Sequence, residues 1–273
     1  MTGPVARTAV VLMAYGTPGS REEILPYYTD IRRGRPPTPE QLADLVRRYA
    51  AIGGLSPLAA RTEAQRVALA TALDERAPGR FEVVLGLKHA NPLIEEAATD
   101  VLARGIRRIV GLVLAPHYSA FSVGQYLDRL RTAAEPGGAD VRGIESWATT
   151  PEYVSFLAAE VHRNLDAMPP GTQVLFTAHS LPERILTTGD PYPSELRSTA
   201  ELTSAALRLP SSMWSLAWQS AGRTPEPWLG PDILAAGSPG ASVDPDMLLP
   251  LVREAVGHPK PPGPYLTTEI SNK

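Results

Sequence analysis

Two apolar segments of this chain end in the same way, and they constrain its fold more than any other feature. Each is a short apolar run that stops at a histidine followed by small or polar residues: VGLVLAPHYS (residues 110–119) and VLFTAHSLPE (residues 174–183). Such runs are typical of buried parallel strands. Because open α/β sheets bind ligands beyond the carboxyl ends of their strands, we expect His117 and His179 to lie where this architecture places its chemistry.

Strand and helix patterns alternate along the first half of the chain. Two further apolar runs are predicted to be strands that end at Tyr15 and His89. Helical patterns cover residues 39–50, 61–76, 92–104 and 122–134, and a weaker strand, VRGIES, precedes Trp147. This order favours a parallel sheet with right-handed crossovers.

The same alternation restarts after Trp147, with fewer strands. Helices are predicted over 151–165 and 193–207, and strands over 173–177 and 212–220. We therefore predict two related α/β domains, each a doubly wound parallel sheet, over residues 1–148 and 149–256. The second sheet is expected to be incomplete, and residues 257–273 are expected to form a disordered tail.

Composition narrows the class of protein. A net charge of −3 argues against a general binder of nucleic acids or anionic membranes. No apolar stretch is long enough for a membrane helix, and the N-terminus lacks a signal-peptide pattern. Without cysteine, disulfides, thiol nucleophiles and cysteine-ligated clusters are excluded. We expect a cytoplasmic enzyme.

Four predicted strands end at a residue whose ring carries a polar atom. These four residues are the candidates for a catalytic or metal-binding role. They are Tyr15, His89, His117 and His179. An imidazole can accept a proton or bind a metal at neutral pH, and a deprotonated phenol can bind a hard metal ion. Taken singly, each is more often a structural side chain. Ser180 adjoins His179 on an extended chain, which argues against a catalytic triad.

A basic run, IRRGRPP (residues 31–37), is the strongest signal for an anionic ligand. Arg47 and Arg48 follow one element later. Such a run is usually a solvated face. A loop bracketed by glycine and proline can instead present guanidinium groups that bind carboxylates. Ser56 and Tyr126 could add neutral donors.

Blocks of sequence from about residue 8 to Asp232 resemble the ferrochelatase family, in particular its soluble bacterial coproporphyrin branch. The matching blocks are MAYGTP, PYYTDIRRGRPP, IGGLSPL, GLKHANP, LAPHYSAFSVGQY, ESW, AHSLPERI, GDPYP and WQSAGRTPEPWLGPD. The resemblance implies two Rossmann-like domains that hold a tetrapyrrole. It also implies insertion of Fe²⁺ into coproporphyrin III to give coproheme, as a step in heme synthesis.

The resemblance also implies roles for individual residues. His179 would take a pyrrole proton or pass the metal, and Tyr15 would bind the metal from the opposite face of the macrocycle. The positions that match propionate-binding residues are Thr17, Arg32, Arg48, Ser56 and Tyr126. Coproporphyrin III and Fe²⁺ would be substrates, with no permanently bound cofactor. We expect a monomer that neither inserts into membranes nor binds nucleic acid.

One departure from the family concerns the region after Asp232. The resemblance implies a further segment whose glutamate works with the histidine, and this chain lacks that segment. Loss of a general acid–base partner predicts activity lower by roughly 100- to 10,000-fold. The strand that carries Trp214 and Trp218 should also have an exposed edge.

Three alternatives stay open at this point. A non-catalytic tetrapyrrole-binding protein would keep the fold without metal insertion. A cobalt chelatase of related fold is disfavoured by the IRRGR and WQSAGRTPEPWLGPD blocks. Metal preference is also open, because nitrogen and oxygen ligands suit Zn²⁺ and Co²⁺ as well.

Overall fold

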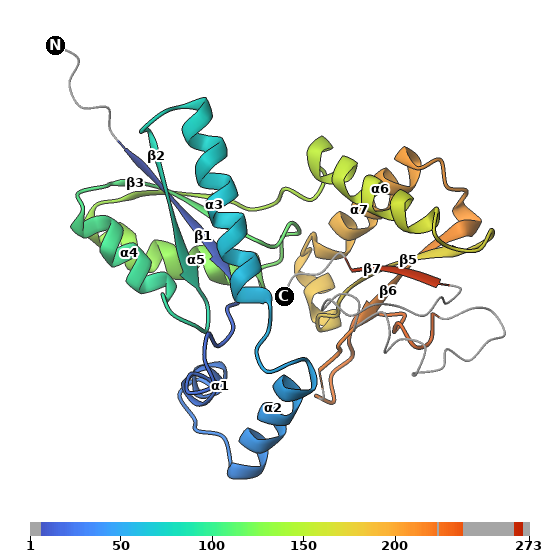
Figure 1. Cartoon of the computed structure of the whole chain (residues 1–273), viewed down its shortest axis with the longest axis horizontal. Coiled ribbons are helices and arrows are strands. Elements are labelled where there is room, and N and C mark those ends of the chain that lie inside the picture. The colour runs from blue at the N-terminus through green and yellow to red at the C-terminus, as the bar shows by residue number, and fades with distance from the viewer. Residues whose placement is uncertain (1–6, 223, 237–264, 270–273) are drawn as a thin grey trace. The chain divides into compact units, whose positions relative to one another are not determined.

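The computed structural model describes residues 7–222, 224–236 and 265–269 and contains two parallel sheets (Figure 1). The chain divides into two compact units: residues 1–114 with 124–145, and residues 115–123 with 146–273. The predicted α/β class, with a smaller second sheet, is confirmed. Residues 246–256, whose sequence has a helical pattern, and most of the predicted tail lie outside the described residues.

The first unit is built around a four-stranded sheet in the order β2-β1-β3-β4, with every neighbouring pair parallel. Its strands are β1 (Thr8–Ala14), β2 (Phe81–Leu87), β3 (Arg108–Val113) and β4 (Asp140–Ile144). Its helices are α1 (Ile24–Ile31), α2 (Pro39–Ala51), α3 (Leu58–Arg76), α4 (Ile94–Ala103) and α5 (Val123–Ala134), followed by a short 3₁₀ turn, Glu135–Gly137. The sequence pattern did not predict α1.

Both faces of this sheet are covered, and β1 within it is buried on both sides. On one face Val10 and Leu12 form a core with Val83, packed against residues of α3. On the other face α4 packs against β1 and β2. There Gly111 and Gly143 let α5 lie close, since a Cβ at either glycine would fall within 3 Å of side-chain atoms of Leu127.

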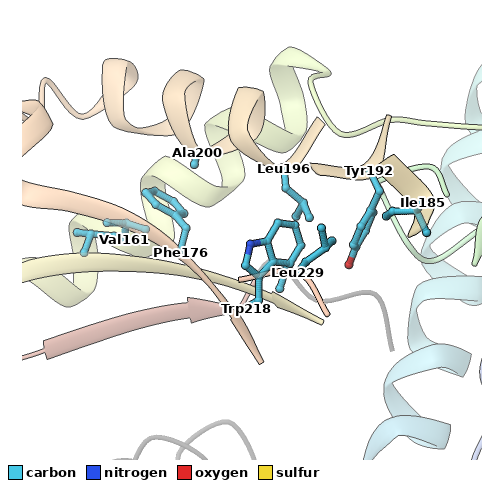
Figure 2. Close-up of a cluster of buried hydrophobic side chains, with 10 residues drawn as sticks. Val161, Phe176, Ile185, Tyr192, Leu196, Ala200, Trp218 and Leu229 are labelled. Atoms are coloured by element: carbon cyan, nitrogen blue, oxygen red, sulfur yellow. The ribbon is translucent and has the colours of Figure 1, made fainter. Parts of the chain in front are cut away.

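The second unit has a three-stranded parallel sheet in the order β6-β5-β7. Its strands are β5 (Gln173–His179), β6 (Trp214–Gln219) and β7 (Tyr265–Glu269), and its helices are α6 (Pro151–Leu165) and α7 (Tyr192–Ala206), with short 3₁₀ turns at Glu183–Thr188 and Ser211–Met213. Figure 2 shows the core, in which Phe176 and Trp218 from the strands lie beneath Leu196 and Ala200 of α7.

The segment 115–123 belongs to the second unit, although the predicted N-terminal domain included it. Two carboxylates of the second unit bind its backbone. Glu195 accepts a hydrogen bond from Tyr118 N at 2.7 Å, and Asp190 accepts one from Ala120 N at 2.9 Å. Asp190 also accepts from the Ser119 hydroxyl at 2.9 Å. These distant partners could not be seen in the local pattern.

Two expectations for the second sheet need correction. Residues 265–269 of the expected disordered tail form β7, which pairs along β5 from Gln173↔Tyr265 to Thr177↔Glu269. The outer edge of β6 is covered at one point. Trp218 N donates to Pro231 O at 2.8 Å, and Ile233 N donates to Trp218 O at 2.7 Å. The outer edge of β6 is therefore hydrogen-bonded at Trp218 and is not fully exposed.

Candidate active site

The first unit places Tyr15 and His89 together at the carboxyl ends of β1 and β2. His89 N donates to Tyr15 O at 3.1 Å, so the parallel pairing of the two strands continues for one residue beyond them. The two rings meet edge to face, with centroids 4.6 Å apart. The predicted proximity of these strand ends therefore holds for this pair.

Asp30 of α1 fixes the imidazole of His89. The His89 Nδ1 and the Asp30 Oδ2 are 2.6 Å apart. Burial lowers the pKa of His89, and the positive charges of Lys88 and Arg129 add to this effect, while the Asp30 carboxylate opposes it. A neutral imidazole that donates through Nδ1 leaves Nε2 as an acceptor.

Phenols surround Tyr15. Burial raises the pKa of the Tyr15 phenol, and Tyr49 and Asp30 raise it further. Burial likewise raises the pKa of Tyr27 and of Tyr126. This end of the sheet therefore presents several neutral hydroxyls, which are donors suited to an anionic ligand.

Lys88 is a site residue that the sequence reasoning did not single out. Its Nζ lies 5.0 Å from the centroid of the Tyr126 ring and donates to Gln125 Oε1 at 2.8 Å. Arg129 donates to Lys88 O at 2.7 Å and forms a two-pronged ion pair with Glu95. The segment GLKHANP could have indicated Lys88, because this residue directly precedes the candidate His89.

The basic run forms an open cavity of about 400 Å³, lined by Ile31, Arg32, Arg33 and Arg35. Arg32 Nε donates to Arg35 O at 3.2 Å, which ties this guanidinium to the loop backbone. Arg48, the other predicted carboxylate-binding arginine, lies exposed on α2 and pairs with Asp44 at 3.1 Å. Arg32 therefore lines the cavity, whereas Arg48 does not.

The two predicted hydroxyl residues each have a partner in the protein. Thr17 is buried, and its Oγ1 lies 3.2 Å from Tyr49 Oη. Ser56 is half-buried, and its Oγ accepts from Leu58 N at 3.2 Å at the start of α3. Both belong to the first unit, together with Tyr15 and Tyr126.

The second unit holds His179 as the last residue of β5. Its carbonyl oxygen accepts from Tyr192 Oη at 3.1 Å, and its Nδ1 is buried, although the residue as a whole is partly exposed. Ser180 bonds to the backbone instead: its N donates to Gln219 O at 2.7 Å and its Oγ to Leu229 O at 2.8 Å. The hydroxyl of Ser180 is thereby bonded to the backbone of Leu229.

His117 occupies a different environment from the other three rings. It is fully buried, and its Nε2 lies 2.9 Å from Thr199 Oγ1. The Thr199 hydroxyl also lies within hydrogen-bond distance of the Ala148 and Glu195 carbonyls. This is the setting of a structural side chain, and it corrects the expectation that His117 faces a ligand crevice at the end of β3.

The described part of the chain contains no group of three or more His, Cys, Asp or Glu side chains placed to hold a metal ion. The same part contains no helix that is long and apolar enough to span a bilayer. The groups described above include imidazoles, phenols and guanidinium groups. They suit proton transfer and the binding of a carboxylated ligand.

Comparison with known proteins gives one consistent answer. The family model described as Ferrochelatase matches residues 7–237. The coproporphyrin III ferrochelatase of Halalkalibacterium halodurans is 43% identical over 231 residues, which are 83% of this chain and 74% of that protein. The corresponding protein of Geobacillus kaustophilus is 45% identical over 236 residues, 84% of this chain and 74% of its own length.

A third relative has a broader name. The ferrochelatase of Herpetosiphon aurantiacus is 42% identical over 235 residues, 84% of this chain and 76% of that protein. The matched region of the family model includes every residue named above in the candidate site. This chain belongs to the ferrochelatase family.

Proposed function

We propose that this chain is a coproporphyrin III ferrochelatase, which inserts Fe²⁺ into coproporphyrin III and releases two protons to form coproheme. The observation that carries the proposal is an identity of 43–45% with proteins of that name over more than four-fifths of the chain. The proposed reaction accounts for a site rich in imidazole, phenol and guanidinium groups, because its substrate is a carboxylated macrocycle that must lose protons.

His179 is the residue we assign to proton removal. Each Fe²⁺ that enters the ring displaces two pyrrole protons, so a neutral base beside the ring lowers the barrier. A neutral imidazole can accept one of them. Its position at the end of β5 supports this role, as does its partial exposure.

Tyr15 is the residue we assign as a ligand to the iron. Its phenol oxygen is a hard donor that suits iron. The carboxylates of the substrate would be bound by guanidinium and hydroxyl groups of the first unit, namely Thr17, Arg32, Arg48, Ser56 and Tyr126. Of these, Arg32 has the strongest support, because it lines a basic cavity.

An anaerobic insertion assay tests the proposal. The full chain is mixed with Fe²⁺ and coproporphyrin III, and coproheme is followed by its absorbance. We expect formation above the protein-free rate, and we expect His179→Ala to return it to that rate while the porphyrin still binds. His162→Ala, at an exposed histidine on α6, is the matched control and should leave the rate unchanged.

The same assay separates the second candidate function, a non-catalytic tetrapyrrole-binding protein. The observation that favours it is that residues 233–273 contain no match to the family's segment after Asp232. Tight binding of coproporphyrin III without insertion of Fe²⁺, Zn²⁺ or Co²⁺ would establish that candidate and refute the enzymatic one. This chain belongs to the ferrochelatase family, which argues against a cobalt chelatase of a separate class.

A further inference from the structure

The strand ends of the first unit fix the backbone of Tyr15. His89 N donates to Tyr15 O at 3.1 Å, which joins the end of β1 to the end of β2. Gly16, the next residue, has a φ of +86°, and a Cβ there would lie 2.9 Å from Ala90 Cβ. This close approach favours glycine, which has no Cβ and adopts a positive φ without strain. The main chain at Tyr15 is therefore set, and the orientation of its phenol ring depends on side-chain contacts.

A contact with the imidazole of His89 orients this phenol ring. The two ring centroids are 4.6 Å apart and the ring planes meet at 60°, which is an edge-to-face arrangement. Only 14% of the His89 side chain is exposed. A ring can orient its neighbour only when it is itself held in one position, so the hydrogen bonds of His89 determine how firmly the phenol is held.

The carboxylate of Asp30 holds the imidazole from α1, 59 residues away in the sequence. The Asp30 Oδ2 lies 2.6 Å from the His89 Nδ1. A carboxylate has acceptor atoms and no donor, so the Nδ1 carries the hydrogen and donates it. Hydrogen bonds to a charged acceptor are short and strong. The Asp30 side chain is 45% exposed, so its removal leaves the apolar core of the unit intact.

We infer that Asp30 is a positioning residue, which holds the His89 imidazole so that this ring orients the Tyr15 phenol toward iron. The inference rests on the proposed function, because it takes Tyr15 to be a ligand to the metal of coproheme. Asp30 acts through His89, and its effect is therefore expected only where the phenol and the iron are both present.

The main chain of Asp30 has a role separate from that of its carboxylate. Asp30 O accepts from Arg33 N at 2.8 Å, and Thr29 O accepts from Gly34 N at 2.9 Å. These bonds hold the loop in which Arg32 lines the basic cavity. A substitution of the Asp30 side chain keeps them. It should therefore weaken the bond to iron and leave the binding of substrate carboxylates unchanged.

Two ligands separate these effects in the full chain: ferric coproheme, and coproporphyrin III without metal. We expect Asp30→Ala to raise the Kd for coproheme by roughly 2- to 10-fold, because a phenol that is no longer held must be ordered when it binds iron. The Kd for metal-free coproporphyrin III should stay unchanged. In a Tyr15→Phe background, Asp30→Ala should have no further effect on the Kd for coproheme, because the phenol that it orients is absent.

The conservative variant Asp30→Asn checks the route through His89. Its amide oxygen still accepts from the His89 Nδ1, so the Kd for coproheme should return to the wild-type value. The absorbance band for charge transfer from the phenolate to ferric iron should be weaker in Asp30→Ala than in the wild type. In Asp30→Asn this band should regain its wild-type strength.

A second measurement needs no ligand. In the free protein, the NMR resonances of the Tyr15 ring, identified by their loss in Tyr15→Phe, should shift in Asp30→Ala, because the imidazole beside them is released. They should not shift in Asp140→Ala, the control. Asp140 pairs with Arg142 at 3.4 Å at the amino end of β4, which lies at the sheet edge opposite Tyr15.

Several results would overturn the inference. These are unmoved Tyr15 resonances in Asp30→Ala, an unchanged Kd for coproheme, an equal rise in the Kd for coproheme and for metal-free coproporphyrin III, or an equal effect of Asp30→Ala with and without the Tyr15 phenol. Failure of the wild-type chain to bind coproporphyrin III would instead refute the proposed function. The resonances of the free protein do not depend on that binding, so the two failures are distinguishable.

Discussion

His117 and His179 end similar sequence segments, but their surroundings differ. His117 is enclosed and bonded to a threonine 82 residues away, whereas His179 is partly exposed at the end of its strand. The local pattern could identify both as residues near strand ends. It could not separate them, because the deciding partner, Thr199, lies on a helix of another part of the sequence.

The bond between His117 and Thr199 gives the first prediction. Thr199→Val keeps the shape of the side chain but leaves a buried imidazole nitrogen without this partner. We expect the free energy of unfolding to fall by about 1–3 kcal/mol, measured by urea denaturation. Thr187→Val, which removes an exposed hydroxyl bond in the same unit, should change it by less than about 0.5 kcal/mol. Equal losses in the two variants would contradict the structural role of His117.

The pKa of His89 gives the second prediction. Burial holds this pKa below its ordinary value near 6.5, despite the neighbouring Asp30. As the pH falls below about 6.5, the unfolded chain takes up a proton that the folded chain does not. The free energy of unfolding therefore decreases as the pH decreases. Unfolding measured between pH 8 and pH 5 should show this slope, and His89→Gln should reduce it. His162→Gln, at an exposed site, is the control, and a slope equal in the wild type and His89→Gln would contradict the assignment.

At the scale of elements, α5 depends on two glycines of the sheet beneath it. A Cβ at Gly143 would lie 2.7 Å from Leu127 Cδ1, closer than side chains approach one another. Gly143→Ala should therefore lower the free energy of unfolding by about 1–3 kcal/mol. In a Leu127→Ala background the same change should be smaller, because the clashing atoms are gone. An equal loss in both backgrounds would show that the glycine acts through its backbone instead.

β7 is the element that the sequence pattern missed. The segment YLTTE is short and follows a stretch rich in proline, so its local pattern resembled a tail. Its pairing with β5, about 90 residues earlier, is a tertiary property. In contrast, β1, β2 and β3 were predictable because they are mostly apolar runs, and β1 is buried on both faces.

Removal of β7 provides a fourth prediction. A chain that ends at Pro264 leaves the β5 edge without its partner, and such edges promote self-association. We expect a lower midpoint in urea and a rise in mass by light scattering. A chain that ends at Glu269 keeps the strand and serves as the control. Identical behaviour of the two shortened chains would exclude a stabilising role for β7.

At the scale of the whole molecule, the two units differ in how far the sequence could anticipate their sites. In the first unit, Tyr15 and Arg32 follow from a strand end and a basic loop, whereas Thr17 follows only from the family resemblance. Lys88, Asp30 and the phenols of Tyr27 and Tyr49 did not follow, because their importance comes from side chains that meet only after folding. In the second unit, the pattern located His179 but not the carboxylates that bind residues 115–123.

The expected departure from the family concerns the second unit. This departure determines the rate of metal insertion that we expect. The resemblance implies a glutamate beyond Asp232 that assists His179, and residues 233–273 contain no match to the segment expected to carry it. Without that carboxylate, the imidazolium formed after proton transfer has lost its stabilising partner. We therefore expect kcat to be roughly 100- to 10,000-fold below that of the Geobacillus kaustophilus relative, measured side by side under anaerobic conditions.

Added carboxylate provides the decisive control for this prediction. If the missing group is the cause, acetate or formate in the buffer should raise the insertion rate of this chain in proportion to its concentration. His179→Ala should not respond, because the base that acetate would assist is gone. Turnover equal to that of the relative, without added carboxylate, would show that other groups of this chain perform the step.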